Sequence, residues 1–90
     1  MRFAIITTDK PGALETRMEN RPAHVSYLKE SGVVEMAGPF LDENDQMCGS
    51  LIVIDVDDLS AAKAWAENDP YKKAGLFSDV RIQAWNKVIG

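Results

Sequence analysis

Hydrophobic and polar positions change period several times along the chain, and each change predicts a new element. Arg2–Thr8 is a short run of β-forming residues that a Pro-Gly turn ends. Val33–Phe40 is a second such run, whose Pro39 is typical of a strand end or an edge strand. Gly49–Val56 contains Leu-Ile-Val-Ile without alternation, which predicts a strand covered on both faces. Apolar and polar residues alternate in Asp79–Ile89, which predicts a fourth strand.

The region between the first two strands carries apolar residues at helical spacing. These residues are Leu14, Met18, Val25 and Leu28. Pro22 interrupts the stripe, and proline is best tolerated at the first position of a helix because it has no amide hydrogen to donate. The pattern therefore predicts a short helix near Ala13–Glu19 and a second helix that starts at Pro22 and stops at Gly32.

A further helix is predicted between the third and fourth strands. Asp58 is a suitable N-cap, and the residues after it carry apolar side chains at i, i+3 and i+4 as far as Asn68. Asp69 ends this helix, because a residue that precedes a proline disfavours helical geometry. Pro70–Leu76 is long enough for one more helical turn.

The resulting order, β-α-β-β-α-β, predicts the fold class. Residues 1–90 are expected to form one α+β domain, a ferredoxin-like sandwich with an antiparallel sheet and both helices on one face. Helices cover only one face of such a sheet, so the apolar run Leu51–Ile54 requires another cover for the opposite face. The sheet of a second copy is the simplest cover, and we therefore expect a homodimer through the sheet face.

Composition and charge narrow the classes of partner. The net charge of −4 gives the chain no general attraction for nucleic acid or anionic membranes, and the third strand lacks the aromatic residues of an RNA-binding sheet. The single cysteine, Cys48, excludes an intramolecular disulfide, and no Cys/His cluster or EF-hand spacing indicates a metal site. Met1–Thr8 does not resemble a signal peptide, and no apolar run could span a bilayer, so we expect a cytoplasmic protein.

His24 is the only histidine, so any proton transfer by an imidazole near neutral pH must use it. If Pro22 begins a helix, His24 lies in the first turn, where free backbone N–H groups favour a neutral imidazole. Asp69 is suited to cap the turn that follows it, or to orient and support the imidazole as a carboxylate does in catalytic pairs. For both residues the structural role is the commoner one, and spacing alone does not bring them together.

Other polar side chains are weaker candidates. Ser50 at the start of the third strand is a possible nucleophile or hydrogen-bond donor to a substrate. Arg17 and Arg21 are four residues apart and are suited either to an anionic substrate group or to pairing with Glu15 and Glu19.

Short motifs spread over nearly the whole chain occur in the order known from one family. They are Arg21-Pro22-Ala23-His24, Ala37-Gly38-Pro39, Gly49-Ser50, Ala64-Trp65-Ala66, Asp69-Pro70-Tyr71, Ala74-Gly75-Leu76-Phe77 and the terminal Trp85. Together they resemble the YciI-like (YCII-related) family. The resemblance implies a dimer of the dimeric α/β-barrel type, with His24 and Asp69 side by side in a small cleft that serves as the active site.

One branch of that family resembles dehydrochlorinases of chlorinated hydroxy-aromatics, in which the histidine, the aspartate and a serine are implicated. Ser50 is our candidate for the serine. We therefore expect a cofactor-independent lyase or isomerase in which His24 is the acid/base, Asp69 holds its tautomer, and Ser50 or Tyr71 positions a substrate oxygen, with Arg21 also contacting the substrate. The alternatives are a non-catalytic domain that binds small molecules and a dimerisation module.

Overall fold

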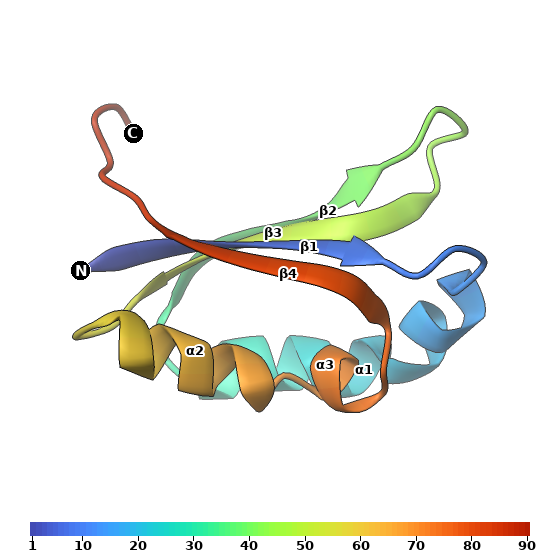
Figure 1. Ribbon diagram of the computed structural model, residues 1–90, viewed down its shortest axis with the longest axis horizontal. Helices are drawn as coiled ribbons and strands as arrows, with labels where there is room; N and C mark the ends of the chain where they lie inside the picture. Colours follow the sequence, from blue (N-terminus) through green and yellow to red (C-terminus); the bar gives the residue numbers. More distant parts are fainter.

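The computed structural model describes residues 1–90 and has two layers, a sheet and a set of helices beneath it (Figure 1). The four strands are antiparallel and lie in the order β2-β3-β1-β4. They are β1 (Arg2–Asp9), β2 (Val34–Leu41), β3 (Met47–Asp55) and β4 (Phe77–Ala84). The helices are α1 (Leu14–Glu30), α2 (Leu59–Glu67) and α3 (Pro70–Lys73). This arrangement confirms the predicted ferredoxin-like α+β sandwich, and Pro39 lies in an edge strand, as expected.

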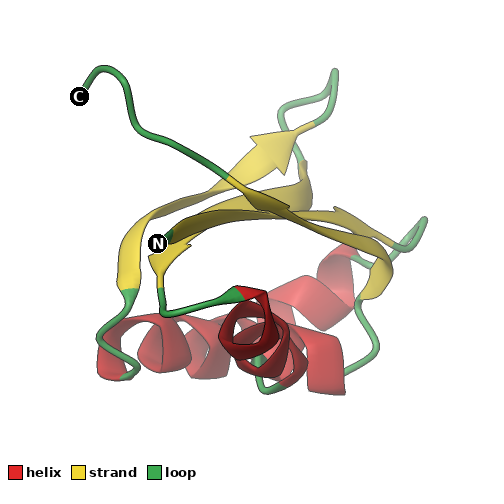
Figure 2. Ribbon diagram, turned by 60° about the vertical axis from the view of Figure 1, so that its left-hand side comes forward, coloured by secondary structure: helices red, strands yellow, loops and turns green.

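The core lies between the two central strands and the helices (Figure 2). Phe3 and Ile5 of β1 pair with Ile54 and Ile52 of β3, and all four side chains point towards the helices. They pack against buried residues of α2, namely Ala62, Trp65 and Ala66. Each large apolar side chain buried in this way contributes about 1.5–3 kcal/mol, which makes this cluster the main source of stability.

Helix α1 is continuous, which corrects the prediction of two helices separated at Pro22. Pro22 is exposed, so water can reach the Met18 carbonyl that the proline ring leaves without its helical donor. Arg17 and His24, buried on either side of Pro22, tie both halves of the helix to the domain. Met18 is 50% exposed, so it does not belong to the buried stripe that the apolar spacing indicated.

The strand ends differ from the predicted ones for reasons of pairing. Strand β3 begins at Met47, before the predicted start at Gly49, because Met47 pairs with Leu41. Strand β4 runs from Phe77 to Ala84 rather than over Asp79–Ile89. Its only neighbour is β1, and after the bond from the Trp85 amide to the Arg2 carbonyl that neighbour has almost no chain left to pair with.

One face of the sheet carries no helix (Figure 1). The turn between β2 and β3 and the C-terminal residues both rise on this side. The register places Met36 and Phe40 here, beside Leu51 of β3, and they are 52% and 40% exposed. The cover predicted for this face is therefore not supplied by the chain itself. No helix is both long and apolar enough to cross a membrane.

Candidate functional site

The two residues that the sequence could not place together are in contact. His24 lies in the middle of α1, and Asp69 lies in the short link between α2 and α3, forty-five residues further along the chain. The distance from His24 Nδ1 to Asp69 Oδ1 is 2.7 Å, and both residues are buried. An ionised carboxylate has no hydrogen to donate, so Nδ1 carries the hydrogen of a neutral imidazole. The lone pair is then on Nε2, the other ring nitrogen.

The environment of His24 differs from the one expected at a helix start. Because α1 begins at Leu14, the free N–H groups of its first turn are far from His24, and the prediction that His24 lies in a first helical turn is wrong. What faces the imidazole is the carboxylate of Asp69. Asp69 also caps α3, since its Oδ1 accepts a hydrogen bond of 2.9 Å from the Tyr71 amide. The two roles considered for Asp69 therefore coexist.

Aromatic stacking fixes the plane of the imidazole. The rings of His24 and Tyr71 are parallel to within 13°, with their centroids 3.8 Å apart. The Arg17 guanidinium carbon lies 4.7 Å from the centroid of the same tyrosine ring. Burial raises the pKa of Tyr71 above its ordinary value, although the nearby positive charges of Arg17 and Arg21 lower it. The Tyr71 phenol therefore keeps its proton at neutral pH.

A second buried ion pair holds Ser50. Arg17 donates two hydrogen bonds to Asp9, of 2.7 and 3.0 Å, and its Nη2 also donates to the Ser50 hydroxyl at 3.0 Å. Burial lowers the pKa of Arg17, but the hydrogen bond and charge of Asp9 raise it, and the net direction is upward. Since Ser50 accepts from Arg17, its own hydroxyl hydrogen is free to be donated elsewhere.

Asp9 is not among the predicted site residues, because it follows the predicted first strand, Arg2–Thr8. The alternation of side chains along β1 does indicate that Asp9 points towards the helices. Phe3, Ile5 and Thr7 alternate towards the helices, and Asp9 continues that alternation by one more step. A carboxylate on the buried side of a strand needs a cationic partner, and Arg17 is that partner.

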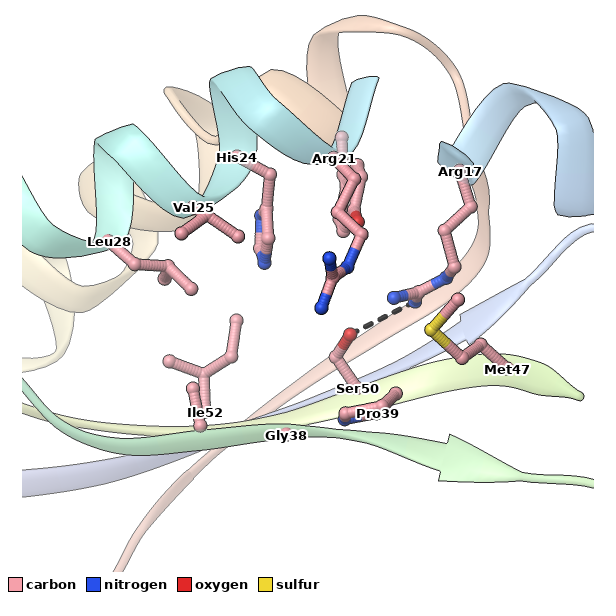
Figure 3. A pocket seen from close by; sticks show the side chains of 12 residues that line it. Arg17, Arg21, His24, Val25, Leu28, Gly38, Pro39, Met47, Ser50 and Ile52 are labelled. Atoms are coloured by element: carbon pink, nitrogen blue, oxygen red, sulfur yellow. Dashed lines mark hydrogen bonds between the residues drawn. The ribbon is translucent and has the colours of Figure 1, made fainter. Parts of the chain in front are cut away.

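These side chains surround a pocket of about 130 Å³ between α1 and the strands β2 and β3 (Figure 3). Its lining consists of Arg17, Arg21, His24, Val25, Leu28, Ala37, Gly38, Pro39, Met47, Ser50, Ile52 and Tyr71. Four of the five predicted site residues therefore line one pocket. The fifth, Asp69, is buried and reaches the pocket only through His24. The sequence pattern does not indicate Met47, because this residue precedes the predicted start of the third strand at Gly49.

Two other polar side chains lie outside the pocket. The Cys48 thiol is 3.6 Å from the carbonyl of Phe40, and Cys48 does not line the pocket. Asp42 accepts backbone hydrogen bonds from Asn44 and Gln46, so this carboxylate stabilises the turn between β2 and β3. No group of three or more His, Cys, Asp or Glu side chains is placed to hold a metal ion.

The fold and the site define a ferredoxin-like domain of the dimeric α/β-barrel class with a buried histidine–aspartate pair at a small pocket. The chain belongs to the YCII-related domain family, which matches residues 1–86. It is 36% identical to protein YciI of Escherichia coli O6:H1 over 97 residues, which cover 98% of this chain and 99% of that protein. It is 35% identical, with the same coverage, to an uncharacterized protein of Haemophilus influenzae.

Solved structures agree with this assignment. A 5-chloro-2-hydroxyhydroquinone dehydrochlorinase from Burkholderia phenoliruptrix AC1100, in complex with 2,5-dihydroxybenzoquinone, is 32% identical with a TM-score of 0.87; the match covers 96% of this chain and 94% of that one. An antibiotic biosynthesis monooxygenase has a TM-score of 0.61 at 12% identity, covering 98% of each chain. That second similarity shows the fold alone.

Proposed function

We propose that this chain is a small lyase or isomerase that works by proton transfer, with His24 as the general base and acid. The observation that carries the proposal is the 2.7 Å contact between His24 Nδ1 and buried Asp69, beside a pocket that His24 lines. With the hydrogen held on Nδ1, Nε2 is free to accept a proton from a bound substrate. Asp69 fixes that tautomer and stabilises the imidazolium that forms.

The other polar residues of the pocket suit the positioning of substrate oxygens. Ser50 has a hydroxyl hydrogen to donate, because Arg17 already donates to its oxygen. Tyr71 keeps its phenolic proton and holds the imidazole plane by stacking. General acid–base help of this kind contributes about 10²–10⁴ in rate. That magnitude suits the removal of an already acidic proton and not the hydrolysis of an amide.

The similarity to the solved dehydrochlorinase, at 32% identity, supports elimination from a hydroxylated ring as the reaction class. In such a step Nε2 of His24 takes a proton from the substrate. The electron pair of the bond that held this proton moves into the ring. The carbon–chlorine bond then breaks, and chloride leaves with the bonding pair. The products are the ring with an added double bond, chloride, and a protonated imidazole. The imidazolium then releases its proton to water. Electrons balance without a redox carrier, so the proposed reaction needs no cofactor.

We also propose that the chain acts as a homodimer through the open face of the sheet. Met36 and Phe40 are exposed there beside Leu51, and this patch suits a second copy of the same sheet. Two such sheets face to face would give the barrel of the dimeric α/β class, with both pockets on the outer, helical sides.

The experiment is a screen of chlorinated and hydroxylated single-ring phenols for chloride release and ring isomerisation. We expect turnover in the unaltered protein, a fall of about 10²–10⁴ in His24→Gln, and normal activity in Lys63→Gln, an exposed substitution on α2. Tight binding of a phenol without any turnover, or full activity in His24→Gln, would contradict the proposal. Tight binding alone would support the non-catalytic alternative.

A further inference from the structure

The charges around the pocket are unequal in a chain that is acidic as a whole. The net charge of the chain is −4, yet the pocket is lined by Arg17, Arg21 and His24 and by no carboxylate. Two of these basic side chains have an acidic partner outside the lining, since Arg17 pairs with Asp9 and His24 with Asp69. Arg21 takes part in no ion pair. Its positive charge is the uncompensated one.

Arg21 is also placed to use that charge on a ligand. It lies on α1 between Arg17 and His24, with its guanidinium directed into the pocket (Figure 3). It is exposed, whereas Arg17 is 2% exposed and has three hydrogen bonds to side chains of the chain itself. A ligand therefore meets Arg21 with free N–H groups, while Arg17 is occupied in positioning Ser50.

The hydrogen-bonding chemistry of the other polar side chains also favours a ligand with acceptor oxygens. Arg17 and Arg21 are donors only, Ser50 retains one hydrogen to donate, and Tyr71 keeps its phenolic hydrogen. The only basic acceptor left for a ligand is Nε2 of His24, because Nδ1 is bonded to Asp69; the hydroxyl oxygens of Ser50 and Tyr71 are weaker acceptors. A ligand that matches this lining is rich in oxygen acceptors and presents a proton for His24 to take.

The volume limits the size of the ligand. A cavity of roughly 150 Å³ holds one benzene molecule, and the pocket measures about 130 Å³ with one wall formed by exposed residues of β2. One six-membered ring therefore fills it, with room for small substituents towards the open side.

We propose that the pocket selects single-ring molecules carrying one negative charge on oxygen, a phenolate, enolate or carboxylate, and that Arg21 is the residue that makes this selection. The inference concerns the same pocket as the proposed function and rests on the proposal that the substrate binds there. A guanidinium donates two parallel N–H bonds to a carboxylate and a charge-assisted N–H bond to a phenolate or enolate oxygen, and it binds a neutral carbonyl or amide more weakly.

Benzoate and benzamide provide the test, because they have nearly the same shape and differ in charge. Dissociation constants would be measured by ligand-observed NMR in the unaltered protein and in Arg21→Gln, Arg21→Lys and Lys63→Gln. We expect benzoate to bind about tenfold more tightly than benzamide in the unaltered protein and in Lys63→Gln, where a charge is lost from the outer surface of α2. The preference should nearly vanish in Arg21→Gln and be partly retained in Arg21→Lys.

Equal affinity for the two probes, an unchanged preference in Arg21→Gln, or no binding of either probe would overturn the inference. Neither probe has a leaving group, so this result does not depend on turnover. Anion preference that is lost in Arg21→Gln, together with no reaction in the phenol screen, would uphold the inference and refute the proposed function. Turnover of phenols without any anion preference would support the proposed function and refute the inference about Arg21.

Discussion

Nδ1 of His24 lies 2.7 Å from the same Asp69 oxygen that caps helix α3. One atom therefore stabilises the start of a helix and orients the imidazole. A substitution at this position changes the fold and the site together unless it preserves the cap. Asp69 is for that reason the position where structural and chemical contributions most need to be separated.

Asp69→Asn separates the two contributions. An asparagine oxygen still accepts from the Tyr71 amide, so we expect the free energy of unfolding to change by less than about 1 kcal/mol. The negative charge beside the imidazole is lost, and we expect proton-transfer activity to fall by about 10²–10⁴. Asp69→Ala removes the cap as well and should cost a further ~1 kcal/mol. Urea unfolding and chloride-release assays on both variants check this, and equal stability of the two variants would contradict it.

The Arg17–Asp9 pair predicts a large effect on stability. In Asp9→Asn the guanidinium stays buried without an opposite charge, so we expect a loss of about 3 kcal/mol. Replacing both residues, as in Arg17→Met with Asp9→Leu, should recover most of that loss. Arg2 and Glu35 form a comparable pair that is about one-third exposed, and Glu35→Gln should cost much less. Denaturation midpoints of these variants give the comparison.

Alkaline pH should destabilise the chain. Burial raises the pKa of both tyrosines, Tyr27 and Tyr71, above the ordinary value of 10.0. Because the unfolded chain releases these protons at a lower pH than the folded chain, the stabilising effect is complete below pH 10 and is lost as pH rises through the folded values. Denaturation midpoints measured from neutral to alkaline pH should fall in that window.

The two tyrosines can be followed individually, since they are the only ones in the chain. Phenolate absorbance should appear at higher pH in the folded protein than in urea. Tyr71→Phe and Tyr27→Phe should each remove one of the two delayed titrations. A folded protein whose tyrosines both titrate as they do in urea would be inconsistent with the burial seen here.

Two glycines of neighbouring strands should differ in their tolerance of alanine. A Cβ built at Gly49 would lie 2.2 Å from the backbone carbonyl oxygen of Thr7, so Gly49→Ala forces β1 and β3 apart. We expect a loss of about 2 kcal/mol. A Cβ at Gly38 meets nothing within 4 Å, and Gly38→Ala should leave stability nearly unchanged. Thermal unfolding of the two variants measures the difference, and equal losses of stability would contradict the structure.

The proposed dimer predicts a specific sensitivity on the open face of the sheet. Met36→Lys places a charge in the patch formed with Phe40 and should convert the dimer to a monomer. Leu59→Lys changes a residue of similar exposure, 43% against 52%, on the helical side and should leave the dimer intact. Sedimentation velocity distinguishes the two outcomes, and a monomeric unaltered protein would refute the proposal.

The order of elements and the fold could be predicted because the apolar periods are local. Each strand or helix pattern lies within a single segment, and the main difference between prediction and structure, the unbroken α1, concerns Pro22. The general cost of a proline inside a helix was outweighed by the burial of Arg17 and His24 on either side of it. The continuity of α1 through Pro22 therefore depends on tertiary contacts, which the local sequence does not show.

The site was predictable only in part. His24 could be singled out as the one histidine, and its pairing with Asp69 came from the family resemblance rather than from spacing. The network from Asp9 through Arg17 to Ser50 joins three different elements, and no local pattern links them. The stacking of Tyr71 on His24 likewise depends on how α3 is packed against α1.

A donor-lined pocket in an acidic molecule also has a consequence for the kinetics of binding. The net charge of −4 repels an approaching anion, Arg21 attracts it towards the pocket, and both effects fall off over about 10 Å in 0.1 M salt. Added salt should weaken the arginine contact and therefore increase the dissociation rate constant, with a smaller effect on the association rate constant, where attraction and repulsion oppose each other. An anionic ligand reaches this pocket against the field of the whole molecule and is retained by the field of one side chain.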